Sequence, residues 1–210
     1  MLATQLFELA EGHADELGAE GLIASFYENP AGVAFARTRG FRQMRAETES
    51  ILDPRTVTEL PPADVDLRPV SGVDPRLVHA VDVEATLDVP QTETVDHIPY
   101  GEWRQYVLEN PLFADEGSFV AMVDDVAAAV SLLVADPESG RAMNMFTGTL
   151  RAYRGRGLAL AVKLATTHWA AANGITQIVT DNDETNAGML AINRRLGYKP
   201  GGRRVEYLRS

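Results

Sequence analysis

The residues most able to do chemistry are 154–159, Arg-Gly-Arg-Gly-Leu-Ala, between a predicted strand and a predicted helix. Small residues let the main chain approach a ligand closely, and the first turn of a helix offers free N–H groups and a partial positive charge. The expected ligand is therefore an anion, and a pyrophosphate fits. Two other phosphate loops are excluded, because Gly-Lys-Ser/Thr is absent and Leu160 stands where a dinucleotide fingerprint needs a third small residue.

This segment resembles the signature of the GNAT superfamily of N-acyltransferases: arginine or glutamine, two residues, glycine, one residue, glycine or alanine. Arg154, Gly157 and Ala159 satisfy it. Residues 186–198, Asn-Ala-Gly-Met-Leu-Ala-Ile-Asn-Arg-Arg-Leu-Gly-Tyr, are similar to the family helix that begins at asparagine and ends Leu-Gly-Phe, and the order of elements in residues 64–210 also matches. The resemblance implies an α/β fold with a mixed, mostly antiparallel sheet, splayed central parallel strands and flanking helices.

The resemblance also implies a site for acetyl-CoA as cosubstrate, where strands 143–150 and 175–180 splay apart. Pantetheine would bond to exposed main chain as an added strand. The glycine-rich main chain would hold the pyrophosphate, assisted by Arg154 or Arg156, for which a solvated loop is the alternative. The expected cofactor-binding residues are Phe146, Thr147, Gly148, Thr149, Leu150, Arg154, Gly155, Arg156, Gly157, Leu158, Ala159 and Asn186.

The catalytic residues depart from the family pattern. Many GNAT enzymes have a tyrosine on the last helix that protonates the departing thiolate, and Asn193 stands in its place. Asparagine cannot be a general acid, but a thiol with a pKa of about 8.5 leaves readily as an anion. Asn193 is expected to donate a hydrogen bond to the sulfur, or else to be a helix-surface residue. The candidates for a general base, each with a solvated loop residue as its alternative, are Asp181, Asp183, Glu184, Glu93, Asp96 and His97.

Composition and charge exclude several other classes of protein. The net charge of -11 argues against a nucleic-acid surface, and the four histidines lack metal-ligand spacing, so no metal is expected. Without cysteine there is no disulfide and no cysteine acyl-enzyme. The longest apolar stretch, residues 126–135, is too short for a bilayer, and the first residues lack a signal-peptide pattern, so a cytoplasmic location and no membrane partner are expected. Seventeen arginines against two lysines, in an Ala- and Val-rich chain, indicate a GC-rich bacterial genome.

The elements that must position these residues follow from periodicity and from capping residues. Asp74 and Pro75 are expected to begin a helix, Asp124 and Asp125 to form a hairpin turn, and Gly197 to end the last helix. The expected strands are 65–70, 118–123, 126–135, 143–150, 175–180 and 203–208, the expected helices are 76–87, 103–107, 158–172 and 187–196, and residues 181–186 are expected to form a polar turn.

The first fifty residues contain an internal repeat. Residues 29–41 have the Asn-to-Gly spacing of residues 186–198, within a similar helix-strand-helix context, although chance similarity is the alternative. The hypothesis is a partial GNAT-like half over residues 1–52 (helix-strand-helix-strand), a linker over 53–64 and a complete acyltransferase domain over 65–210. The missing glycine-rich loop of the first half would lie just ahead of Met1, so we expect a late or misassigned start, or a truncated half covered by the intact domain or by a second chain.

The function expected from the sequence is direct transfer of acetyl from acetyl-CoA to a primary amine of a small molecule or peptide, without a covalent enzyme intermediate. Asn193, Asp183 and Glu184 are the expected catalytic residues. The alternative is a catalytically inactive acyl-CoA-binding or regulatory module, which the asparagine at position 193 and the incomplete first half motivate. An amine-bearing acceptor is the expected partner, and a homodimer is possible.

Overall fold

The computed structural model describes residues 2–88 and 98–210. Glu93, Asp96 and His97, three of the base candidates, lie outside the described residues. The chain divides into two compact units, Met1–Thr48 with Gly202–Ser210, and Glu49–Gly201. In the described residues no helix is long and apolar enough to cross a membrane.

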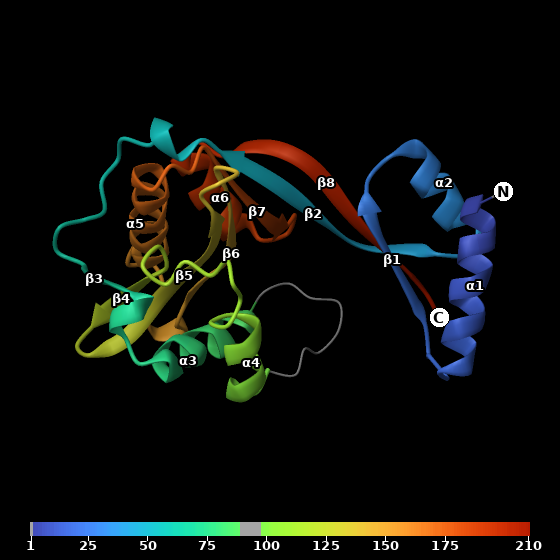
Figure 1. The fold of residues 1–210 in the computed structure, drawn as a ribbon, viewed down its shortest axis with the longest axis horizontal. Coiled ribbons are helices and arrows are strands. Elements are labelled where there is room, and N and C mark those ends of the chain that lie inside the picture. Colours follow the sequence, from blue (N-terminus) through green and yellow to red (C-terminus); the bar gives the residue numbers. More distant parts are fainter. Residues whose placement is uncertain (1, 89–97) are drawn as a thin grey trace. The chain divides into compact units, whose positions relative to one another are not determined.

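The elements alternate along the chain and are labelled in Figure 1. The helices are α1 (Leu2–Glu16), α2 (Pro30–Thr38), α3 (Pro75–Thr86), α4 (Tyr100–Tyr106), α5 (Leu158–Ala172) and α6 (Ala187–Leu196). The strands are β1 (Leu22–Tyr27), β2 (Arg42–Leu52), β3 (Asp66–Pro69), β4 (Phe119–Val123), β5 (Val126–Asp136), β6 (Arg141–Thr149), β7 (Gln177–Asp183) and β8 (Lys199–Arg209). Short 3-10 turns are η1 (Pro54–Thr56), η2 (Val70–Gly72) and η3 (Arg151–Tyr153).

Local signals in the sequence account for most of the predicted boundaries. The Asp74 side chain accepts a bond from the Arg76 N–H at 2.9 Å, and α3 begins at Pro75 as predicted. The predicted helices 158–172 and 187–196 coincide with α5 and α6. The prediction for residues 181–183 was wrong, because they extend β7 instead of forming a turn. Burial of Thr180 and Asp183 in this strand explains the difference, since tertiary packing overrides polar composition.

The strands are hydrogen-bonded in the order β1-β8-β2-β7-β6-β5-β4-β3. The β3–β4, β4–β5, β5–β6 and β1–β8 pairs are antiparallel, whereas β6 and β7 are parallel. The predicted fold class, a mixed and mostly antiparallel sheet flanked by helices, is therefore confirmed.

The parallel strands β6 and β7 pair over only part of their length. Their register is Arg141↔Gln177, Ala142↔Ile178 and Met143↔Val179, while β6 continues to Thr149 and β7 to Asp183. The described ladder ends at the third pair, so main-chain groups on this edge of β6 are left without a β7 partner. Such a free edge can accept an extended ligand as an added strand.

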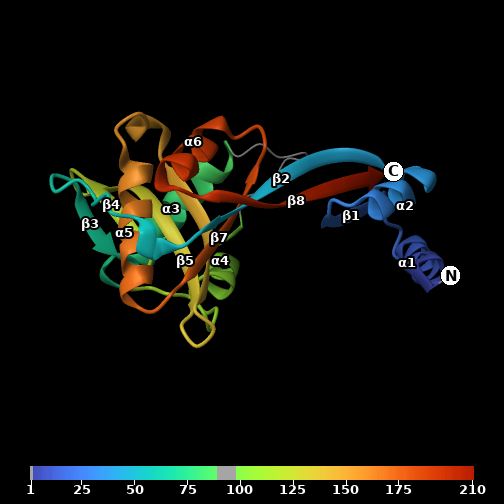
Figure 2. The ribbon, with the colours of Figure 1, turned by 90° about the horizontal axis from the view of Figure 1, so that it is seen from above.

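Helices cover both faces of the strands within the unit Glu49–Gly201. Val120 and Val130 pack with α3 and α4, whereas their neighbours Ala121 and Ala129 pack against α5. Successive side chains of a strand point to opposite faces, so α5 lies on one face and α3 on the other, as Figures 1 and 2 show. Helix α5 is buried along most of its length, which makes it the central helix of this unit.

The other unit has its own small core. Helices α1 and α2 pack on strands of this unit through a cluster that contains Phe41, Val205 and Tyr207. Its N-terminal part follows the order helix, strand, helix, strand, which is the predicted order for residues 1–52, and most of β8 also belongs to the unit. The interpretation as a partial GNAT-like half, and the boundaries of the proposed linker and complete domain, stay predictions.

Candidate functional site

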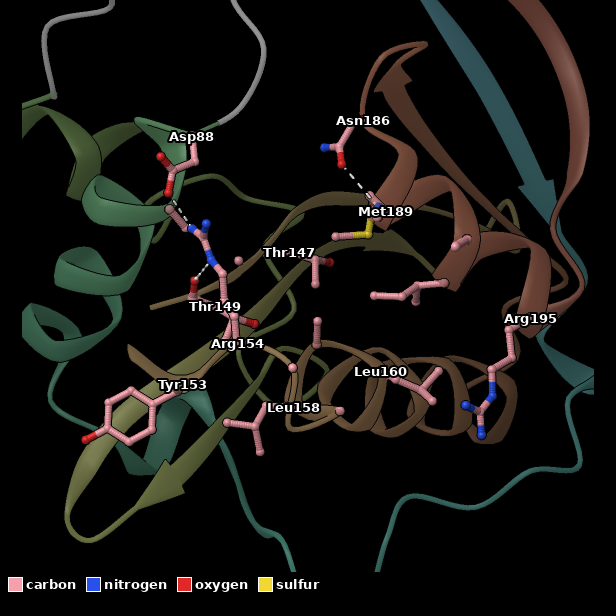
Figure 3. Close-up of a pocket in the computed structure, with 18 residues that line it drawn as sticks. Asp88, Thr147, Thr149, Tyr153, Arg154, Leu158, Leu160, Asn186, Met189 and Arg195 are labelled. Carbon is pink, nitrogen blue, oxygen red and sulfur yellow. Dashed lines mark hydrogen bonds and ion pairs between the residues drawn. The ribbon is translucent and has the colours of Figure 1, made fainter. Parts of the chain in front are cut away.

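A cavity of about 610 Å³ lies within the unit Glu49–Gly201, beside the end of β6 and the start of α5. Figure 3 shows that its walls come from β6, the loop that follows it, the first turn of α5 and the side of α6. Ala85 and Asp88, from the end of α3 and just beyond, complete the wall. The cavity therefore begins where the β6–β7 ladder has ended and the edge of β6 is free.

The cavity brings together most of the residues predicted to bind the cofactor. Those that line it are Thr147, Gly148, Thr149, Arg154, Gly155, Gly157, Leu158, Ala159 and Asn186. Phe146 and Leu150 pack instead against the hydrophobic core beneath α3. Arg156 is exposed, with its guanidinium 5.1 Å from the centre of the Tyr153 ring. The sequence left open whether Arg154 or Arg156 assists the pyrophosphate, and Arg154 is the one that lines the cavity.

Two glycines shape the loop that leads into α5. Gly155 and Gly157 have φ values of 75° and 77°, a region that costs other residues about 1–2 kcal/mol. A Cβ atom at either position would meet no described atom within 4 Å, so each glycine faces open space. Gly157 is also the N-cap of α5 and supplies no side-chain acceptor to the first N–H groups, and the first turn contains no acidic residue. This helix start is thus open to an anion.

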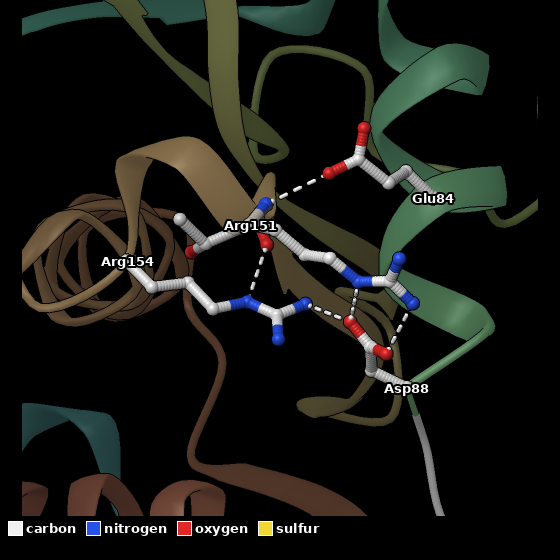
Figure 4. A network of polar contacts seen from close by, with 5 residues as sticks. Glu84, Asp88, Arg151 and Arg154 are labelled. Carbon is white, nitrogen blue, oxygen red and sulfur yellow. Dashed lines mark hydrogen bonds and ion pairs between the residues drawn. The ribbon is translucent and has the colours of Figure 1, made fainter.

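Arginines flank the loop and share one carboxylate. Arg154 Nη2 lies 2.6 Å from Asp88 Oδ2, and Arg151 Nε lies 2.7 Å from the same oxygen. The Arg151 N–H also donates to Glu84 Oε1 at 2.8 Å, which ties the loop to α3, as Figure 4 shows. Hydrogen bonds from Arg151, and then from Arg154, hold the pKa of Asp88 well below its usual range. The two guanidinium groups are thus balanced by the Asp88 and Glu84 carboxylates, and Arg154 is the cation of this group that lines the cavity.

Several residues of the cavity were missed from the sequence. Met189, Ile192 and Arg195 recur every three residues along α6 and line its cavity side, as does Leu160 on α5. This spacing was a usable signal, because residues three apart on a helix share a face. Asp88 gave no such signal, since it is 63 residues from Arg151 in the chain and meets it only through folding.

The residues predicted to be catalytic are not among the cavity-lining residues. Asn193 is 2% exposed, and its Nδ2 donates to Asn182 Oδ1 at 2.6 Å. Asn193 Oδ1 is buried without a hydrogen-bond partner in the described residues. The Asp183 carboxylate is buried and accepts a bond from the Thr185 N–H at 2.8 Å, while Glu184 is exposed. Their catalytic roles stay predictions.

Comparisons with known proteins agree with this geometry. The chain matches the model described as Acetyltransferase (GNAT) family over residues 81–198, more than half of its length. It resembles the structure of a GCN5-related N-acetyltransferase from Sphaerobacter thermophilus, with a TM-score of 0.76, 19% identity and coverage of 99% of this chain and 67% of that chain. A tandem GNAT protein from the clavulanic acid biosynthesis pathway has a TM-score of 0.71 and 22% identity, with coverage of 96% and 69%. No curated protein matches the chain.

At 19% and 22% identity the two similar structures show the fold alone, whereas the family model shows to which family the chain belongs. The matched span, residues 81–198, contains every residue that lines the cavity. It also contains the strand split, the glycine-rich loop and the helix α6. The chain belongs to the GNAT family of acetyltransferases.

Proposed function

We propose that this protein transfers an acetyl group from acetyl-CoA directly to a primary amine of a small molecule or peptide. One observation carries the proposal: the open start of α5 and the free edge of β6 line the same cavity. The first suits a pyrophosphate and the second suits the amide-bearing pantetheine arm. CoA has both groups joined in one molecule, and when bound it supplies the acyl thioester.

The walls of the cavity suggest which residues hold each part of the ligand. The main chain of Gly155, Gly157 and Ala159, with the Arg154 side chain, suits the pyrophosphate, because guanidinium and N–H donors match phosphate oxygens. The pantetheine arm suits the β6 edge at residues 147–149. The part of the wall away from Asp88 offers apolar Leu160 and Arg195, which Figure 3 shows together. The Arg195 guanidinium already bonds the Glu59 carboxylate, with 2.5 Å between Nη2 and Oε1. The apolar surface suits an adenine ring, and the 3′-phosphate of CoA would compete with Glu59 for the Arg195 guanidinium.

The carboxylate of the cavity bears on the choice of acceptor. Asp88 lines the wall, but two arginines hold its pKa below the usual range, so it is a poor general base at neutral pH. An amine with a pKa near 8 is appreciably neutral at pH 7, whereas one near 10.4 needs roughly 3–4 kcal/mol to lose its proton. We therefore favour acceptors of low pKa, such as a peptide α-amino group, that release their proton to solvent.

The roles of the predicted catalytic residues are part of the proposal. Asn193 would donate a hydrogen bond to the departing thiolate, and Asp183 or Glu184 would take a proton from the acceptor. The absence of all three from the cavity wall among the described residues favours the second candidate, an acyl-CoA-binding module without catalysis. Amine-dependent release of free thiol from acetyl-CoA separates the two candidates.

The binding step is tested by calorimetry with CoA and acetyl-CoA on two matched glycine variants. Gly157 and Gly174 both have positive φ, 77° and 81°, and a Cβ at either meets no described atom within 4 Å. Gly157→Glu places a bulky carboxylate at the start of α5, so binding should be lost. Gly174→Glu carries the same backbone strain outside the cavity, so binding should persist. A wild-type protein that binds neither ligand would end the proposal.

A further inference from the structure

A buried amine lies behind the cavity, in helix α5. Lys163 is 2% exposed, and in residues 2–88 and 98–210 no carboxylate pairs with it. Its Nζ lies 2.7 Å from Asn144 Oδ1 and 5.1 Å from the centre of the Tyr198 ring. Burial of an amine without a counter-charge is unfavourable, and it lowers the pKa of Lys163 to about 7. Features that reduce stability in this way are typical of functional regions.

The partner of this amine, Asn144, is bonded at both ends of its side-chain amide. Its Nδ2 donates to Ser131 Oγ at 2.8 Å and to the Leu132 carbonyl at 3.0 Å. Its Oδ1 accepts from Lys163 Nζ and, at 2.9 Å, from Thr147 Oγ1. An amide turned by half a rotation would place its N–H groups against the lysine, which is a donor in its charged form. The Leu132 carbonyl can only accept and so needs Nδ2 on its side, and Lys163 Nζ holds the amide oxygen that this orientation presents.

Asn144 lies at the point where β6 and β7 part. It directly follows Met143, the last β6 residue paired with β7. The Asn144 carbonyl accepts from the Thr180 side chain at 3.1 Å, so a hydroxyl replaces the next main-chain bond. The β5–β6 register also shifts here, between Leu132 and Leu133. An irregular strand needs extra bonds to fix its path, and the Asn144 amide supplies them. Beyond this point lies Thr147, on the cavity wall.

We propose that Lys163 is a positioning residue which, through Asn144, fixes the split between β6 and β7 and so holds Thr147 and the free edge of β6 in place for the pantetheine arm of acyl-CoA. The proposal rests on the proposed function for the identity of the ligand. Lys163 itself is not on the cavity wall, so its effect on the ligand passes through the bonds of Asn144.

The first test compares two fully buried positions of α5 by calorimetry with CoA as the probe. Lys163→Met keeps an unbranched side chain but removes the donor, so the Kd for CoA should rise about fivefold, the equivalent of one hydrogen bond. Its unfolding free energy at pH 7 should not fall, because an unfavourably buried amine is removed. Leu164→Ala, whose native side chain is fully buried in a core cluster, should lose stability without a comparable change in Kd. An unchanged Kd for Lys163→Met would overturn the proposal.

Two further measurements test whether the effect passes through Asn144. In a double-mutant cycle on the Kd, adding Lys163→Met to Asn144→Ala should have no further effect, whereas additive effects would contradict the proposal. Amide hydrogen exchange in the ligand-free protein should be faster at residues 145–149 in Lys163→Met, and unchanged exchange would overturn the positioning role. The exchange measurement needs no ligand. If the wild type does not bind CoA, the proposed function is refuted, whereas the exchange result still tests the positioning role of Lys163.

Discussion

The buried lysine makes a quantitative prediction about stability and pH. Burial lowers the pKa of Lys163 to about 7, compared with 10.5 for an exposed lysine. Between these two values the unfolded chain binds a proton that the folded chain does not, so the free energy of unfolding rises with pH. The slope from this one group is about 1.4 kcal/mol per pH unit, and it reaches about 5 kcal/mol in total. Below pH 7 both states are protonated and the slope from this group vanishes.

Tyr198, the titratable residue that faces the Lys163 amine, does not disturb this pH range. Burial raises the pKa of Tyr198, so its phenol stays neutral throughout, and its opposite contribution begins only where tyrosines of the unfolded chain ionise, near pH 10. Measurements between pH 7.5 and 9.5 therefore isolate Lys163 from Tyr198.

Urea unfolding can measure the slope with a matched control. Both tryptophans, Trp103 and Trp169, lie in the unit Glu49–Gly201, so their fluorescence reports the unit that contains Lys163. Wild type and Lys199→Met, which changes the exposed second lysine, should share one slope. Lys163→Met should have a slope lower by about 1.4 kcal/mol per pH unit. Equal slopes in all three proteins would refute the reasoning.

Nuclear magnetic resonance gives a direct check, because the chain has only two lysines. With 13C-labelled lysine the folded protein should show two Cε signals, which the Lys163→Met variant assigns. The Lys163 signal should titrate with a midpoint near pH 7. A midpoint near that of exposed lysines would mean that the amine reaches water, and the stability prediction would then fail as well.

Three further predictions concern the ligand. Asp88→Asn should tighten CoA binding about fivefold, because it removes about 1 kcal/mol of repulsion between the carboxylate and the phosphates. The amide oxygen that replaces it still accepts hydrogen bonds. Weaker binding would mean that the Asp88 charge mainly orients Arg154. Arg195→Gln should weaken binding of CoA but not of dephospho-CoA. Arg194→Gln is the control, because Arg194 does not line the cavity. Equal losses for both ligands would exclude a contact with the 3′-phosphate. Asn193→Ala should lower kcat about fivefold with an unchanged Kd for acetyl-CoA, and an unchanged kcat would leave this residue structural.

The sequence predicted best the features that local chemistry determines. The ends of α5 and α6 depend on nearby residues: Gly157 and Gly197 have positive φ, and the Asn186 side chain accepts from the Met189 N–H at 3.1 Å. The glycine-rich loop was found for the same reason, since its function resides in its main chain. Composition and spacing contain this information because no distant contact is needed to form these elements.

Contacts that depend on tertiary packing were not predictable. The sequence predicted the helix 158–172 from its periodicity but gave Lys163 no role. The helix is buried by clusters on several sides, one around Leu164 and Leu196 and another around Ala128 and Leu158. Lys163 would reach water if only one face of the helix were covered, but in this fold it is enclosed. Asp88 was missed for a similar reason, because its arginine partners arrive from another part of the chain.

Three unfavourable local features of the unit Glu49–Gly201 lie at or behind one cavity. Gly155 and Gly157 adopt positive φ, β6 leaves β7 after three pairs, and Lys163 is buried without a counter-charge. Each feature is unfavourable alone, and each belongs to the short stretch between residues 143 and 163. Such features persist where the surrounding structure holds them in place for a purpose. Their convergence on a cavity that already offers donors for phosphate supports a ligand site whose framework is formed before CoA arrives, with Lys163 and Asn144 as part of that framework.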